Sequence, residues 1–193
     1  DIDSLRVFGS GSVSGDVVSG RVKAMGSLDI GGGLKAQSFS VVGACDVEGR
    51  VLADELSILG AFDADGVEAG AFRARGVLEV NGLLAGDTVE LHIGGGQSRV
   101  DEIGGGRVEV WRHSFGKRNP LIKALGWLSN PSVKAFLRAS VIEADDVSLE
   151  NTRAKIVRGK RVRIGFGCTI DEVEYVESLT VHPKARVGKR TKR

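Results

Sequence analysis

The chain has 193 residues and a net charge of +2, with 41% apolar, 27% charged and only 5% aromatic residues. This length suits one domain, with or without an insertion, and the low aromatic content predicts a core of small and β-branched side chains. Two cysteines, Cys45 and Cys168, are too few for a disulfide framework and lack zinc-ligand spacing, and no apolar run approaches the ~20 residues that cross a bilayer. We expect both thiols to be small core side chains in a reducing cytoplasm.

The two parts of the chain carry opposite charge. Residues 1–111 hold 9 Lys/Arg against 17 Asp/Glu (net −8), whereas residues 112–193 hold 18 against 8 (net +10). Either the solvated faces simply differ in composition, or the asymmetry serves head-to-tail contacts or places a basic end on an anionic surface.

Two glycine series run in step through the first half of the chain. Apolar residues also recur at fixed places, as in Val22, Phe39 and Leu56, and they alternate with polar residues within each unit. Alternation is typical of strands, and a short fixed period is typical of a solenoid. The first series, at intervals of 17, 17, 17 and 16, is Gly9, Gly26, Gly43, Gly60 and Gly76, and the second follows six residues later as Gly15, Gly32, Gly49, Gly66 and Gly82.

This pattern predicts an all-β fold, a right-handed parallel β-helix with about 17 residues and three short strands per turn. Turns stack ~4.8 Å apart, and glycine occupies corners that need φ > 0 or the lack of a side chain. A left-handed helix of hexapeptide repeats is disfavoured, because apolar residues do not recur every six positions. Gly94–Gly96 and Gly104–Gly106 are then wide corners, since neither has the context of a phosphate-binding loop.

Residues 112–139 interrupt the repeat and are expected to form a basic amphipathic helical insertion. Asn119-Pro120 and Asn130-Pro131 each look like a helix N-cap followed by proline, and residues 112–138 contain six Lys/Arg and no acid. The insertion either caps or covers the solenoid or lies on an anionic membrane surface. The residues available for either contact are Leu121, Ile122, Leu125, Trp127, Leu128, Phe136 and Leu137.

The solenoid pattern returns after the insertion. Val147–Leu149 matches the earlier Val89–Leu91, and Val162–Ile164 recurs 17 residues later as Leu179–Val181. One solenoid of roughly eight turns is therefore expected over residues 1–111 and 140–182. The basic tail, residues 183–193, is expected to be disordered, and nucleic acid is disfavoured as its partner because no aromatic platform is interleaved with its Lys/Arg residues.

No catalytic constellation is recognisable in the sequence. His92, His113 and His182 are scattered, and no nucleophile–His–acid spacing occurs. Asp63 and Asp65 share one outward-facing turn, as acids do in pectin-cleaving β-helices, but turns this short leave no wall for a cleft. We expect a protein without enzymatic activity, metal or cofactor.

Several segments resemble the bactofilin family of polymer-forming cytoskeletal proteins. They are the units VVGACDVEGRVLADE and LEVNGLLAGD, and also GSGSVSG, SRVDEIGG and LENTRAKIVRG, which look like a longer bactofilin-like branch of prokaryotes that includes archaea. The resemblance covers most of the chain, apart from its greater length and its insertion. It implies a right-handed β-helix that assembles end to end, without nucleotide, into apolar filaments, often at the membrane. Members often reach the membrane with a hydrophobic N-terminal tail. None precedes Asp1, so we expect either that the insertion contacts the membrane instead or that membrane binding is absent.

The ends of a solenoid suit assembly for an independent reason. Each end exposes unpaired strand edges, which pair with another copy unless they are capped. We therefore expect a self-assembling cytoplasmic scaffold whose main partner is itself. Two alternatives stay open, a membrane-peripheral scaffold that does not polymerise and an extracellular β-helix protein that binds or cleaves carbohydrate. The expected contact residues are Leu5, Val7 and Phe8 in the first turn and Tyr175, Leu179 and Val181 in the last.

Overall fold

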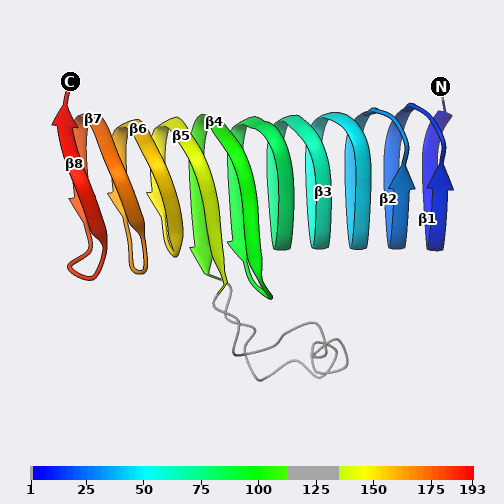
Figure 1. Cartoon of the computed structure of the whole chain (residues 1–193). Coiled ribbons are helices and arrows are strands. Elements are labelled where there is room, and N and C mark those ends of the chain that lie inside the picture. The colour runs from blue at the N-terminus through cyan, green and yellow to red at the C-terminus, as the bar shows by residue number, and fades with distance from the viewer. Residues whose placement is uncertain (1, 113–134) are drawn as a thin grey trace.

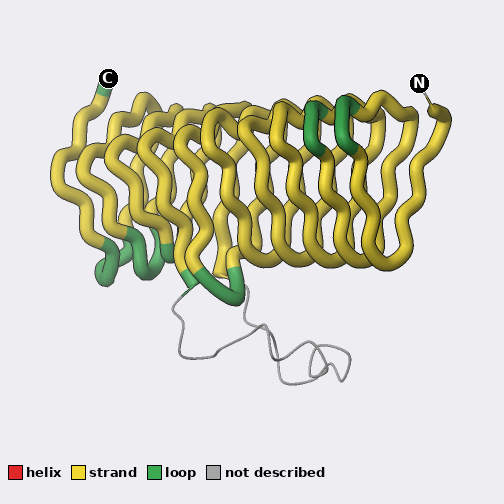
Figure 2. The backbone as a smooth tube through the Cα atoms, turned by 45° about the vertical axis from the view of Figure 1, so that its right-hand side comes forward, coloured by secondary structure: helices red, strands yellow, loops and turns green. Residues whose placement is uncertain are grey.

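The computed structural model describes residues 2–112 and 135–193 and shows parallel strands wound into one solenoid (Figure 1). Each strand pairs in parallel with the next, in sequence order, and no helix occurs in the described residues. A single strand can cover several turns, because pairing continues round the corners of the coil (Figure 2). The predicted parallel β-solenoid is confirmed. The strands are β1 (Ile2–Val13), β2 (Val17–Ile30), β3 (Leu34–Ile93), β4 (Gln97–Arg112), β5 (Phe136–Leu149), β6 (Thr152–Ile164), β7 (Thr169–Val181) and β8 (Arg186–Lys192).

Ten layers stack along the described part of the rod, where roughly eight turns were predicted. The register places Gly9 beside Gly26, and Val89 beside Val108, which in turn lies beside Val147. The prediction was short because the glycine rhythm that marks the turns loosens after Ile93. The layers are counted by one column of inward side chains: Val7, Ala24, Val41, Ile58, Ala74, Leu91, Val110, Leu149, Ile164 and Val181.

The first glycine series forms one corner of the coil. Gly26, Gly43, Gly60 and Gly76 have φ between 129° and 137°, a region that essentially only glycine adopts. A Cβ added at Gly43 would lie 2.0 Å from the carbonyl oxygen of Gly26 in the preceding turn. Conformation and close approach therefore both require glycine here.

The core is continuous across the insertion. β4 pairs directly with β5, so the turns before Arg112 and after Ala135 stack as neighbours. Phe39 and Phe72 are the largest fully buried side chains, and every buried side-chain polar atom of the described residues has a hydrogen-bond partner. The predicted resumption of the repeat after the insertion is confirmed.

The second predicted helix was wrong at Phe136 and Leu137. β5 begins at Phe136, and Leu137 is fully buried beside Ser98 of β4. The helix expected after Asn130-Pro131 does not include these two residues, because Leu137 and Ala139 alternate as a strand and both face the core, where β4 offers a pairing edge. The other residues named for a membrane or capping contact, Leu121, Ile122, Leu125, Trp127 and Leu128, lie outside the described residues.

The prediction of a disordered tail was also wrong. The tail contains β8, which pairs with β7 and completes the tenth layer. Val187 packs against the core, and Lys189 Nζ lies 2.6 Å from Glu172 Oε1 of β7. The basic composition of the tail suggested disorder. In the structure, carboxylates of β7 lie beside the basic residues of β8, and only the strand register could show this.

Replacing a corner glycine should destabilise the solenoid far more than replacing one in open space. We expect Gly43→Ala to lower the free energy of unfolding by at least about 1–3 kcal/mol, the cost of a side chain at this φ, with the steric clash adding to it. Gly15→Ala is the matched control, because a Cβ there would have no atom within 4 Å. Urea denaturation followed by circular dichroism measures both, and equal stabilities would contradict the role given to this corner.

Candidate functional site

The N-terminal end of the rod exposes the unpaired edge of β1. β1 pairs with β2 on one side, and no described strand lies on the other. The inward residues Leu5, Val7 and Val13 pack on the core and are only partly buried, whereas Val22, Ala24 and Ile30 in the next layer are fully covered. This end is therefore an apolar surface rimmed by free backbone groups.

The C-terminal end has the same construction. Its edge consists of β8 together with the second half of β7, which pairs only with β6. Leu179, Val181, Ala185 and Val187 are partly buried against the core. The two ends thus carry matching apolar centres, in the same columns of the coil.

The structure corrects the predicted end residues in two places. Tyr175 is not on the terminal edge, because it pairs with Lys192 of β8. Val13 and Val187 belong to the end faces, and the sequence analysis missed both. For Val187 the signal was its alternation with polar neighbours, discounted when the tail was taken as disordered.

Phe8 points outward from the first layer, with 71% of its surface exposed. Met25, Val42 and Leu59 follow it in the same column, exposed by 43%, 41% and 48%. The three have a neighbouring turn on each side, whereas Phe8 has one on a single side. Another turn stacked on β1 would cover part of the Phe8 ring.

Ion pairs hold the C-terminal layers together on the outside. Arg158 Nε lies 3.0 Å from Glu174 Oε2, and its Nη1 lies 3.3 Å from Glu143 Oε2. Arg161 likewise bridges Asp146 and Glu177, and its hydrogen bonds keep the pKa of Asp146 below its ordinary value. Much of the basic character of residues 153–163 is therefore used within the rod.

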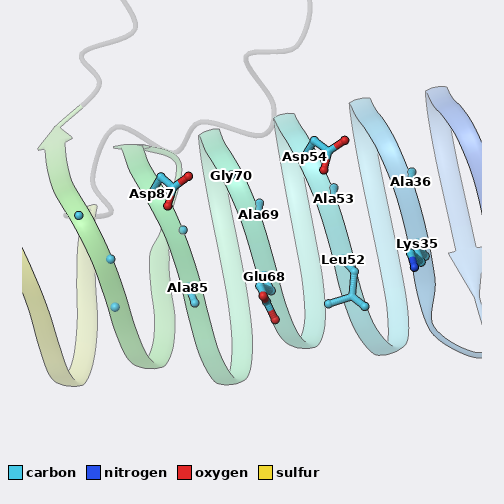
Figure 3. Close-up of a pocket in the computed structure, with 14 residues that line it drawn as sticks. Lys35, Ala36, Leu52, Ala53, Asp54, Glu68, Ala69, Gly70, Ala85 and Asp87 are labelled. Carbon is cyan, nitrogen blue, oxygen red and sulfur yellow. The ribbon is translucent and has the colours of Figure 1, made fainter.

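A shallow groove of about 650 Å³ runs along the rod over a column of small residues (Figure 3). Ala36, Ala53 and Ala69 lie along it, and Glu68, Asp54 and Asp87 are at its sides. These carboxylates come from different turns, and its lining includes no histidine or cysteine. The groove is thus a long indentation without a concentrated set of reactive groups.

Asp63 and Asp65 lie on an outer face, as predicted, and Asp63 belongs to a column of acids. Asp46 precedes Asp63 in this column and Glu79 follows it. Partial burial, and then the charges of Asp46, Glu79 and Asp65, raise the pKa of Asp63 above its ordinary value of 3.8. The folded chain therefore carries a charge here that its surroundings disfavour.

We expect Asp63→Asn to stabilise the protein at neutral pH. Because the pKa of Asp63 is raised on folding, its ionisation costs stability above that pKa, and the cost disappears once the carboxyl is protonated in both states. The advantage of Asp63→Asn should therefore shrink as pH falls toward 3.8. Thermal unfolding of dilute wild-type and variant protein, between neutral pH and pH 3.8, measures this gain in stability. Asp54→Asn, whose neighbour in the next turn is Gly70, is the control and should show a smaller gain.

The other groups considered for chemistry are not brought together. Burial raises the pKa of Cys45 to about 12 and that of Cys168 to about 11, so both are neutral core thiols at physiological pH. His92 stacks on Trp111 with ring centroids 4.9 Å apart, whereas His182 lies four layers away against Phe166. Among the described residues, no group of three His, Cys, Asp or Glu side chains is placed to hold a metal ion. The same residues include no helix long and apolar enough to cross a membrane.

The chain is similar to two proteins of Bacillus subtilis (strain 168). It is 38% identical to the uncharacterized protein YhbF over 112 residues, which is 58% of this chain and 42% of YhbF. It is 36% identical to the uncharacterized protein YhbE over 114 residues, which is 59% of this chain and 44% of YhbE. The chain thus spans less than half the length of either relative. No family model matches the chain, and no solved structure matches it significantly.

Proposed function

We propose that this protein is a structural scaffold whose right-handed solenoids join end to end into filaments without nucleotide. The observation that carries the proposal is the match between the two end faces. Both combine an unpaired parallel strand edge with a partly buried apolar centre. A second copy would give each end layer what every interior layer already has, a paired strand edge and an apolar neighbour on both sides.

Head-to-tail stacking would continue the core columns from one copy into the next. Leu179 would lie over Leu5, Val181 over Val7, and Val187 over Val13, which is the order found between neighbouring layers. Such a joint buries apolar side chains and pairs backbone groups on both sides, so it combines the two contributions that hold the rod together. Open repetition of this contact gives a fibre with a direction. In this it differs from the apolar filaments that the resemblance to bactofilins implies, and it agrees with them in end-to-end assembly without nucleotide.

The resemblance to bactofilins in the glycine-marked units supports the same function. The family assembles end to end without nucleotide, as the end faces of this rod would allow. The proposal assigns the protein no catalytic reaction and no cofactor.

A charge placed on an end face should block assembly. We expect Val7→Lys to raise the protein concentration needed for filaments by about tenfold or more, because burying a valine contributes ~1.5–3 kcal/mol and 1.4 kcal/mol is a factor of ten. Phe8→Lys, at the rim of the same face, should shorten filaments. Negative-stain electron microscopy and sedimentation of the purified protein measure both effects.

Val42→Lys is the matched control, because Val42 is an exposed valine in an interior layer. It should leave assembly by the ends unchanged. If the wild-type protein remains monomeric at all concentrations and shows no filaments, the proposal is wrong. Equal filament loss in Val42→Lys and Val7→Lys would also count against the end faces.

We place the scaffold in the cytoplasm, with the basic segment 112–135 as its contact to an anionic membrane surface. Its support is compositional, since residues 112–135 contain five Lys/Arg and no acid. We expect the protein to sediment with vesicles that contain an anionic lipid, and deletion of residues 113–134 to abolish this. Because β4 and β5 pair directly, the deletion should leave the circular dichroism spectrum strand-like. Equal binding by both forms would exclude the segment as the contact.

A further inference from the structure

One outer face of the rod carries a column of charges that changes sign halfway along it. Between neighbouring strands the register pairs Asp29 with Asp46, Glu79 with Arg99, and Arg138 with Arg153. We call this set the charge column. From the first layer to the tenth it reads Ser12, Asp29, Asp46, Asp63, Glu79, Arg99, Arg138, Arg153, Thr169 and Arg186.

Stacking like charges in this way is unfavourable in an isolated rod. Neighbours in a column are ~4.8 Å apart, and like charges directly opposite on paired strands destabilise a sheet. Within the described residues, Asp29, Asp46, Asp63 and Glu79 take part in no ion pair. Arg158 and Arg161, in contrast, form ion pairs with acids of the neighbouring turns. The same coil therefore pairs opposite charges between turns elsewhere, within a single chain.

The arginines of the charge column are only lightly engaged. Arg99 Nη2 lies 3.2 Å from Asp101, and the Arg153 guanidinium stacks 4.5 Å from the centroid of the Phe136 ring. Neither contact neutralises the acidic half of the charge column, because Asp101 and Phe136 contact only its arginines. Four acids and three consecutive arginines therefore face outward from one sheet.

The order of signs has a two-fold pattern. A two-fold axis that lies in the plane of this face, at right angles to the rod and between the fifth and sixth layers, sets Glu79 of one copy opposite Arg99 of the other, Asp63 opposite Arg138, and Asp46 opposite Arg153. Asp29 then falls opposite Thr169, and Ser12 opposite Arg186. The neighbouring outward column repeats the match once, because Glu48 of the third layer and Lys155 of the eighth exchange under the same rotation. Each acid–arginine pair in this arrangement would occur twice.

We propose that two copies of the protein associate side by side and antiparallel through this face, so that the acidic half of each charge column lies on the basic half of the other. The opposite orientation would place carboxylates on carboxylates and arginines on arginines. Ser27, Ala44 and Ala61, which flank the acids, are small and permit close approach of two flat sheets. Ten layers of ~4.8 Å and a strip about 17 Å wide give roughly 800 Å² per partner, the size of a standard stable interface.

This lateral contact does not depend on the end faces of the proposed filament. It would form between two single rods, and between two filaments that run in opposite directions. A block at the ends, such as Val7→Lys, should therefore leave a discrete dimer. Loss of the dimer in charge-column variants with filaments retained, or the reverse, separates the two contacts.

Charge reversal tests the contact on the full chain in the Val7→Lys background. One variant carries Asp46→Arg and Asp63→Arg, and the other carries Arg138→Asp and Arg153→Asp. Each alone should be monomeric in analytical ultracentrifugation at low salt, because its own pairs become repulsive. An equimolar mixture should form a heterodimer, since all four contacts at these positions then join opposite charges, two with their signs reversed and two as in the parent. The parent should dimerise at low salt and dissociate as salt screens the ion pairs.

A covalent test fixes the register. Asp46→Cys combined with Arg153→Cys places the two thiols in the third and eighth layers, too far apart to react within one rod. Antiparallel pairing predicts a disulfide-linked dimer on mild oxidation, detected by non-reducing electrophoresis. Asp46→Cys alone is the control and should give none, because the two copies of this position would lie about five layers apart.

Several results would overturn the proposal. They are a parent that stays monomeric at low salt up to its solubility limit, reversed variants that dimerise as well as the parent, and a mixture that contains only monomers. Cross-linking by Asp46→Cys alone, equal to that of the double variant, would indicate a parallel arrangement and exclude this one. A parent dimer that forms only with an added divalent cation or polyanion would assign the charge column to that ligand instead.

Discussion

Parallel pairing between successive turns is the constraint on which the rest of this structure depends. Each turn lies in register on the one before it, so that every side chain meets its counterpart at about 4.8 Å. The register therefore places residues at equivalent positions of successive turns next to one another, whether they are apolar or charged. Apolar residues from Val22 to Val162 close a continuous core, and the same rule brings carboxylates together from Asp29 to Glu79. A single turn could not bury its apolar side chains, and a stack can, because each layer covers its neighbours.

The coil takes up irregularity at corners and at local shifts of register. The corner glycines need both a positive φ and the lack of a Cβ, since the preceding carbonyl oxygen occupies that space. The insertion leaves after Arg112, yet β4 and β5 pair as direct neighbours. Register shifts between Val80 and Leu83 and between Gly159 and Arg161 absorb other differences in turn length. Core columns therefore continue through an uneven repeat.

Such a rod carries its interaction chemistry on extended surfaces. At the two ends, backbone groups and apolar side chains lack the second neighbour that interior layers have. On the charge column, the four acids from Asp29 to Glu79 have, among the described residues, no ion-pair partner of the kind that Arg158 and Arg161 have elsewhere on the rod. A second copy of the chain could supply the missing neighbours in both places. A copy stacked on an end would cover the end layer, and a copy lying alongside would pair with the charge column. Both proposals therefore follow from the same repetition, although they involve different residues.

The sequence alone determined the class of fold, because glycine spacing and alternation are local patterns that follow directly from strand and corner geometry. It also identified Leu5, Val7, Leu179 and Val181 as end residues, since they sit at the first and last recognisable repeats. The strand at Phe136, the ordered β8 and the position of Tyr175 were decided only in the folded rod. Each depends on a neighbouring edge or a carboxylate that is distant in sequence. The charge column also emerged only there, because strand register alone determines which acids and arginines share a line.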